Sequence, residues 1–139
     1  MHIDSFTGEY RWLSNFWPCF IRGRDLVYPS VEHSYQAAKC VRLEDRQRFT
    51  TGTAAQAKQA GRGVQVRPDW DLVKKNVMLT ALRLKFTLGS ELAAKLLATG
   101  DTVLVEGNTW GDTYWGVCNG QGQNWLGRLL MQVRHELRR

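Results

Sequence analysis

Apolar residues recur at steps of three and four along much of the chain, which is the spacing of amphipathic helices. The longest stripe follows Asp69, which we expect to cap a helix that Gly89 ends. Ser90 begins a further predicted helix closed by Gly100, and Asn124 caps the last one. The core-facing residues predicted for these three helices are Trp70, Val73, Val77, Ala81, Leu84 and Leu88, then Leu92, Leu96 and Leu97, then Leu126, Leu129, Leu130, Val133 and Leu137.

Shorter elements are predicted in the first half of the chain and near residue 100. Residues 20–22 and 26–28 form a predicted hairpin, and residues 102–106, three of which are β-branched, form a predicted strand. The capping box Thr53-Ala-Ala-Gln56 opens a short helix that Gly61 ends. The predicted fold class is α+β: a single compact, mostly helical domain over residues 1–139, with a small sheet of short strands.

One predicted helix, at about residues 30–41, carries a row of polar residues. Pro29 and Ser30 mark its start, with Ser30 as the N-cap. Glu32, Gln36 and Lys39 are separated by four and three residues, so they share one helix face. Such a row is either a solvated salt-bridge ladder or the floor of an active site, and spacing alone leaves both open.

Composition narrows the function classes. With 139 residues, 43% apolar content and six tryptophans, the chain can form one domain with a substantial core. Three scattered histidines and three widely spaced cysteines predict neither a metal site nor disulfides, and we expect a cytoplasmic protein with no signal peptide or membrane span. A net charge of +6 favours anionic partners such as nucleic acid or phosphorylated small molecules.

Residues 107–124 combine many glycines with aromatic residues, which is typical of a binding loop. Asp112 in this loop can contact ribose hydroxyls or a developing positive charge, although an aspartate that only forms an Asx-turn fits the pattern too. Trp115 can stack on a base, and Glu106 just before the loop is a weaker acidic candidate that could instead pair with an arginine.

Several segments together resemble the YbiA-like, or NADAR (NAD and ADP-ribose), domain family. They occur in the family's order and cover essentially the whole chain. The matching segments are L-S-N-F at 13–16, Y-P-S-V-E-H-S-Y-Q-A-A-K at 28–39, A-K-Q-A-G-R at 57–62, D-W at 69–70, V-M-x-x-A-L-x-x-K-F at 77–86, L-L-A-T-G at 96–100, D-T-Y-W-G at 112–116 and N-W-L-G-R-L-L-M-Q-V-R at 124–134.

The resemblance implies a YbiA-like α+β fold and N-glycosidase chemistry without a cofactor. Cleavage of a ribose–base bond needs a group that stabilises or attacks the anomeric carbon, and a proton for the leaving nitrogen. A desolvated Lys39 could attack as a neutral amine while Glu32 shuttles protons, and Asp112 is the third catalytic candidate. Candidate substrate-binding residues are Asn15, Phe16, Gln36, Glu106 and Trp115.

The favoured hypothesis is hydrolysis of ADP-ribose from guanine bases, so the expected partners are an ADP-ribose-type ligand and ADP-ribosylated DNA or RNA. A close alternative is a ribosylamino-pyrimidine phosphate of the riboflavin pathway. A second alternative is a module that binds ADP-ribose or NAD without turnover. A general nucleic-acid-binding protein would need a dense basic stripe, whereas the 19 Lys and Arg residues are spread along the sequence.

Overall fold

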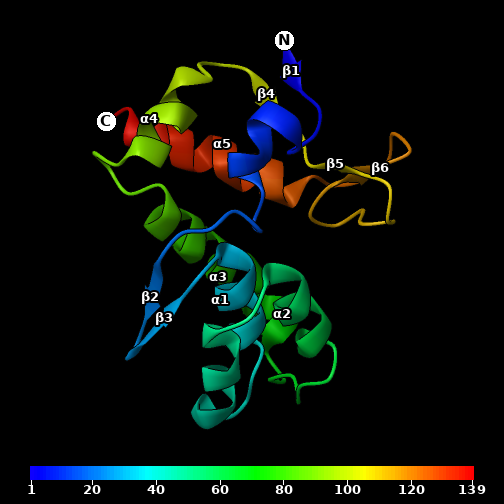
Figure 1. Ribbon diagram of the computed structural model, residues 1–139. Coiled ribbons are helices and arrows are strands. Elements are labelled where there is room, and N and C mark those ends of the chain that lie inside the picture. Colours follow the sequence, from blue (N-terminus) through cyan, green and yellow to red (C-terminus); the bar gives the residue numbers. More distant parts are fainter. The chain divides into compact units, whose positions relative to one another are not determined.

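A computed structural model describes residues 1–139 and divides the chain into two units. One unit comprises residues 15–85, and the other comprises residues 1–14 together with 86–139. Both consist of short helices and pairs of short strands (Figure 1). The predicted α+β, mostly helical fold class is therefore confirmed, while the expectation that residues 1–139 form a single domain stays a prediction.

The unit of residues 15–85 is organised around helix α1. Its strands pair as the predicted antiparallel hairpin, with Ile21 opposite Tyr28. The first strand begins and ends one residue later than predicted, and the second has the predicted bounds. Helix α1 packs against α2, α3 and the 3-10 helix η2 (Figure 1). The elements are β2 (Ile21–Gly23), β3 (Leu26–Tyr28), α1 (Val31–Ala38), η2 (Leu43–Thr50), α2 (Ala54–Gly61) and α3 (Trp70–Lys85).

Helix α1 begins as the sequence predicts and ends earlier. The Ser30 hydroxyl accepts a hydrogen bond from the His33 backbone N–H at 3.2 Å, which confirms Ser30 as the N-cap. The expected continuation to residue 41 is wrong, because the last helical residue is Ala38. Cys40 instead forms an antiparallel bridge with Val66, so the backbone leaves the helix to pair with a segment distant in sequence.

The predicted stripe of α3 is partly wrong. Trp70 and Ala81 are buried as expected, but Leu84 is 41% exposed and the predicted stripe residue Leu88 lies beyond the helix end, 71% exposed. The buried residues in the later part of this helix are Met78, Leu82 and Lys85, besides Ala81. The apolar residues of α3 surround the helix too evenly for spacing alone to identify the buried side.

Three of the five predicted capping residues, Ser30, Thr53 and Ser90, make the expected capping hydrogen bond. Thr53 forms the complete capping box with Gln56, and the Ser90 hydroxyl accepts from the backbone N–H of Ala93. The Asp69 carboxylate, in contrast, accepts two hydrogen bonds from Arg67, at 2.6 and 2.9 Å. The side chain of Asn124 makes no capping bond either, although Asn124 occupies the N-cap position of the last helix.

The unit formed by residues 1–14 and 86–139 contains two parallel strand pairs, β1 with β4 and β5 with β6. Helix α5 packs against β4 and α4, with Leu104 and Leu130 fully buried (Figure 1). None of the helices is both long and apolar enough to span a membrane. The elements are β1 (His2–Ile3), η1 (Gly8–Leu13), α4 (Glu91–Ala98), β4 (Val103–Leu104), β5 (Gly107–Asn108), β6 (Val117–Cys118) and α5 (Trp125–Leu137).

Candidate active site

The polar row on α1 is buried. Glu32 is only 8% exposed and Gln36 only 5%. The amide nitrogen Nε2 of Gln36 donates a 2.6 Å hydrogen bond to Oε2 of Glu32, one helical turn earlier. A solvated salt-bridge ladder would keep its charged groups in water, so the structure excludes that reading for Glu32. The Gln36 amide instead holds the buried Glu32 carboxylate in a fixed position, as a catalytic group requires.

Lys39 follows α1 as its C-cap residue and is half-buried. Burial lowers the pKa of the Lys39 amine, the Glu32 carboxylate opposes this by raising the pKa, and the positive charge of Arg62 lowers it further. The ammonium nitrogen also lies 5.6 Å from the centre of the Tyr35 ring. The net shift of the Lys39 pKa is downward. A larger fraction of the amine is therefore neutral and nucleophilic at a given pH, as nucleophilic attack by Lys39 requires.

Gly61 on α2 leaves space for the Gln36 side chain, a role that the sequence did not predict. A Cβ atom at Gly61 would overlap the Oε1 atom of Gln36, so with any larger residue at position 61 either the buried Gln36 side chain or α2 would have to shift. Oε1 of Gln36 is buried and has no hydrogen-bond partner within the chain. In the sequence, the glycine of the segment A-G-R at 60–62 indicates only a helix end.

Asn15 lies at the start of α1. Its backbone carbonyl accepts a 3.0 Å hydrogen bond from the Glu32 backbone N–H, and its Nδ2 contacts the Met78 sulfur at 3.6 Å. The Oδ1 atom is buried and finds no partner in the chain, which leaves an acceptor that a ligand donor can satisfy. Phe16 beside it in the sequence is 42% exposed, so its ring is accessible to a ligand.

The other unit contains the acidic loop candidates. Oδ1 of Asp112 accepts hydrogen bonds from the backbone N–H groups of Tyr114 (3.1 Å) and Trp115 (2.9 Å). This is the Asx-turn arrangement that the sequence left open, and it fixes the loop. Oδ2 of Asp112 makes no hydrogen bond, so the carboxylate retains a free acceptor. The rings of Tyr114 and Trp115 meet edge to face, with centroids 4.9 Å apart.

Asn108 holds this loop together, and sequence reasoning did not single it out. Its Nδ2 donates to the Asp112 carbonyl at 2.9 Å and to Oε2 of Glu106 at 3.1 Å, while its Oδ1 accepts from the Asp112 backbone N–H at 3.0 Å. A Cβ atom at Gly116 would overlap Glu106, so Gly116 leaves space for that carboxylate. Asn108 therefore links the two acidic candidates of this unit.

The predicted residues thus form two groups, each within one unit. Asn15, Glu32, Gln36 and Lys39 belong to the unit of residues 15–85, with Phe16 next to Asn15 in sequence. Glu106, Asp112 and Trp115 belong to the other unit. Three thiols are free, at Cys19, Cys40 and Cys118.

A family model described as the NADAR domain matches residues 4–138. The chain belongs to this family. The NADAR match thereby confirms the resemblance carried by the sequence segments, and it extends over nearly the whole chain.

Relatives and a solved structure agree with this assignment. The NADAR chain is 40% identical to the N-glycosidase YbiA of Shigella boydii, with 99% of this chain and 88% of that protein aligned. It is 43% identical to a riboflavin biosynthesis protein of Vibrio vulnificus, over 93% of this chain but only 36% of that protein. The NMR structure of Escherichia coli YbiA superposes with a TM-score of 0.85 at 37% identity, covering 99% of this chain and 84% of that one.

Proposed function

We propose that this NADAR protein hydrolyses the N-glycosidic bond between ADP-ribose and a guanine base in DNA or RNA. The broader activity, hydrolysis of N-glycosyl bonds, is supported by relatives that are named N-glycosidases and align over most of their length. The observation that carries the proposed mechanism is the half-buried Lys39 with a lowered pKa, following a buried Glu32–Gln36 pair.

In the proposed reaction, the neutral Nζ of Lys39 attacks the anomeric carbon of the ribose. The carbon–nitrogen bond breaks, its electron pair goes to the guanine nitrogen, and that nitrogen takes up a proton. Glu32 accepts the proton that the attacking amine loses and passes it on. Water then adds to the anomeric carbon of the aminal or Schiff-base intermediate, which releases ADP-ribose and restores the amine.

Asp112 is the proposed stabiliser of positive charge at the anomeric carbon, through the carboxylate oxygen that the Asx-turn leaves free. Asn15 and Gln36 each supply a buried oxygen that accepts from ligand hydroxyl or amino groups. Trp115 and Phe16 supply stacking surface, and Glu106 supplies a second carboxylate for ribose hydroxyls.

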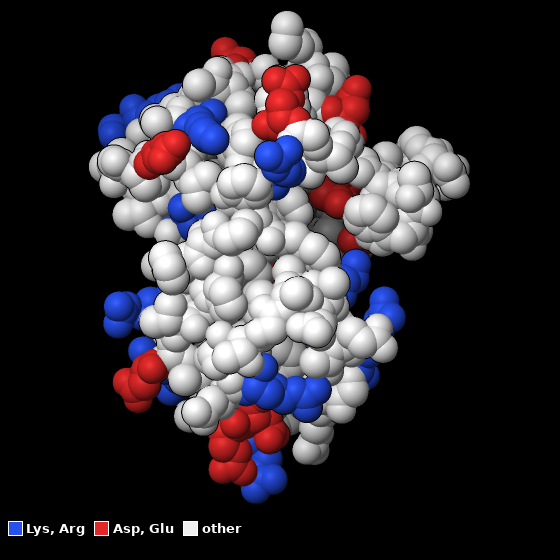
Figure 2. Space-filling model, viewed as in Figure 1, with Lys and Arg blue, Asp and Glu red and all other residues white.

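A second candidate substrate is a ribosylamino-pyrimidine phosphate. The relative from Vibrio vulnificus that is named as a riboflavin biosynthesis protein favours this substrate, although this chain matches only about a third of it. The net charge of +6 favours nucleic acid. On the face shown in Figure 2, however, the basic side chains of each unit are interspersed with acidic ones and form no continuous stripe.

The test is to incubate the protein with an ADP-ribosylated guanine oligonucleotide, add cyanoborohydride and measure the intact mass. We expect an adduct of ADP-ribose mass that disappears in Lys39→Ala and persists in the control Lys75→Ala, an exposed lysine on α3. Release of ADP-ribose without an adduct would retain the activity and refute the covalent route. Turnover of the pyrimidine riboside phosphate alone would refute the proposed substrate.

A further inference from the structure

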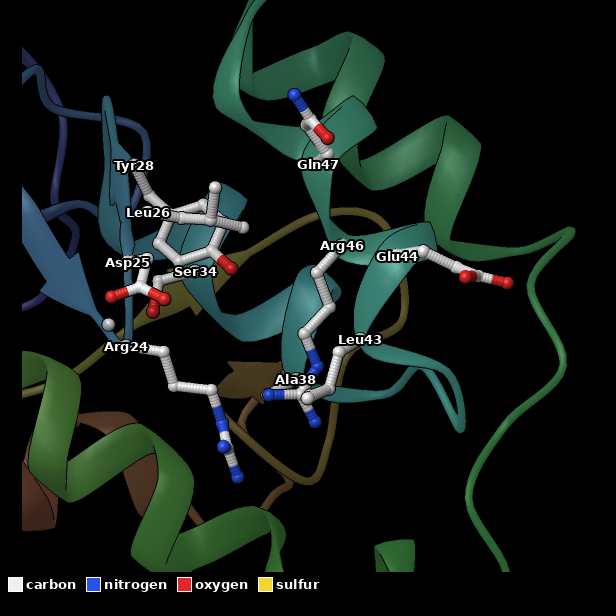
Figure 3. Close-up of a pocket in the computed structure, with 11 residues that line it drawn as sticks. Arg24, Asp25, Leu26, Tyr28, Ser34, Ala38, Leu43, Glu44, Arg46 and Gln47 are labelled. Atoms are coloured by element: carbon white, nitrogen blue, oxygen red, sulfur yellow. The ribbon is translucent and has the colours of Figure 1, made fainter.

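A cavity of about 360 Å³ lies in the unit of residues 15–85 (Figure 3). Its walls are the β2–β3 turn, one side of α1 and the first part of η2. The volume is at the lower end of the range of about 300–1,000 Å³ that small-molecule sites occupy. A cavity of this size accommodates a small ligand rather than a peptide.

The cavity is separate from the candidate active-site row. Ser34 and Ala38, one helical turn apart on α1, line it. At 100° per residue these two positions lie on the side of α1 opposite to Glu32, Gln36 and Lys39. The residues contributed by the hairpin turn and η2 also fall outside the segments that carry the family resemblance.

Arg46 provides an unsatisfied donor at this cavity. Its Nε is buried and finds no acceptor in the chain. The guanidinium makes only one hydrogen bond, a long one of 3.5 Å from Nη2 to the Cys40 carbonyl. A buried guanidinium N–H without an acceptor is costly, because its hydration is lost without compensation. An oxyanion placed at Arg46 would supply that acceptor.

The remaining charges make the cavity basic on balance. Arg24, in the turn between β2 and β3, also lines it, and its side chain forms no ion pair or hydrogen bond. Glu44 is neutralised by Arg42 at 3.0 Å, and Figure 3 shows its carboxylate directed away from Tyr28 and Asp25. Asp25 is therefore the one lining carboxylate not engaged by an arginine, against the two guanidiniums of Arg24 and Arg46.

The other residues that line the cavity indicate which further groups a ligand would carry. Leu26, Ala38, Leu43 and the Tyr28 ring supply apolar surface. Asp25 also lines the cavity, where its carboxylate can accept hydrogen bonds from hydroxyl or amino groups of a ligand. A flat apolar body, hydroxyl donors and an anionic group are combined in a nucleotide.

We propose that this cavity is a second ligand site, which binds a nucleoside monophosphate with its phosphate at Arg46 and Arg24. The nucleobase lies against Leu26 and the Tyr28 ring, and a ribose hydroxyl donates to Asp25. This site is independent of the N-glycosidase proposal, because it shares none of the residues assigned to that reaction.

The test uses AMP as the probe and the full chain labelled with ¹⁵N. Titration should shift amide signals of residues 23–28 and 43–47, and Arg46→Gln should raise the Kd about tenfold or more, as expected for loss of a hydrogen bond to a charged group. Arg24→Gln, in an exposed turn, should weaken binding in the same direction and guards against a folding defect in the Arg46 variant. Thermal melting of both variants checks the fold.

The matched control is Arg48→Gln, two residues further along η2, whose guanidinium donates to the Ala60 carbonyl at 3.2 Å and does not line the cavity. It should leave the Kd for AMP unchanged. Signal changes confined to residues 13–16 and 32–39, or equal binding by Arg46→Gln and the wild type, would overturn the proposal. Absence of binding up to millimolar AMP would overturn it too. Loss of glycosidase activity in Lys39→Ala bears only on the proposed function.

Discussion

Gln36 donates a 2.6 Å hydrogen bond to the buried carboxylate of Glu32, and the chain contains the same pairing in an exposed position. On α5, Nε2 of Gln132 donates to Oε2 of Glu136 at 3.2 Å, also four residues apart. The first pair is buried and the second is exposed, and the order of the two residues along the helix is reversed. A hydrogen bond to a charged group is strengthened by a low local dielectric, so the buried pair matters more for stability and for holding Glu32 in place.

Gln36→Ala should therefore lower kcat/KM of the glycosidase by about 10-fold or more and the free energy of unfolding by about 1–3 kcal/mol. The physical reason is that Glu32 loses its amide donor while it remains buried. Steady-state kinetics and urea unfolding measure the two effects. Gln132→Ala is the control and should change both by little, since exposed pairs contribute about 0.5 kcal/mol or less. Equal effects of the two substitutions would contradict the positioning role.

Gly61→Ala should destabilise the protein by about 1–3 kcal/mol, because the added methyl group overlaps Gln36 Oε1 and forces the buried Gln36 side chain or α2 to shift. The glycosidase should lose activity as well, since Gln36 holds Glu32. Gly63→Ala is the matched control, because its added Cβ would lie 3.8 Å from the Ala60 carbonyl oxygen, an ordinary contact. A neutral or stabilising effect of Gly61→Ala in urea unfolding would show that the Gln36 side chain or α2 shifts at little cost.

Lys85 predicts a pH dependence of stability. It is 4% exposed, and burial lowers the pKa of its amine from 10.5 to about 7, while the charge of Cys19 acts in the opposite direction. Between these two values the unfolded chain binds more protons than the folded chain, so the unfolding free energy should rise with pH from about 7 to 10.5.

Lys85→Met should flatten that rise, because it removes the titrating group and keeps an apolar side chain of similar length. Urea unfolding at several pH values in this window gives the slope. Lys75→Met, at an exposed position on the same helix, should leave the slope as in the wild type. A wild-type stability that falls with pH over this window would contradict the depressed pKa.

Asn108→Ala should disorder the loop of residues 106–116 and reduce glycosidase activity by about 10-fold or more, because four hydrogen bonds that its side chain makes with Glu106 and Asp112 are lost together. Amide signals of the loop and steady-state kinetics measure the effect. Thr109→Ala, an exposed neighbour in the same loop, should be close to neutral. Full activity in Asn108→Ala would show that the Asp112 position does not depend on this network.

The sequence by itself determined the family, the fold class and the local starts of helices. Ser30, Thr53 and Ser90 were identified correctly because each cap hydrogen bond is closed within three residues, so its geometry depends only on adjacent sequence. The glycosidase activity class followed from the family segments. The sequence also identified the candidate site residues and the chemistry of their side chains. It did not show which of them are buried or which hydrogen-bond partners they have.

Only the tertiary structure decided which sides of the helices are buried and where Glu32, Gln36 and Lys39 lie relative to solvent. Helix α1 ends at Ala38, and Cys40 just beyond it pairs with Val66. The Gln36 side chain is buried against α2 at Gly61, where the absence of a Cβ atom leaves space for it. These contacts join residues more than 20 positions apart, and no local propensity encodes them. Burial, pKa and hydrogen-bond partners depend on such contacts, which is why the chemistry of Lys39 became visible only in the folded chain.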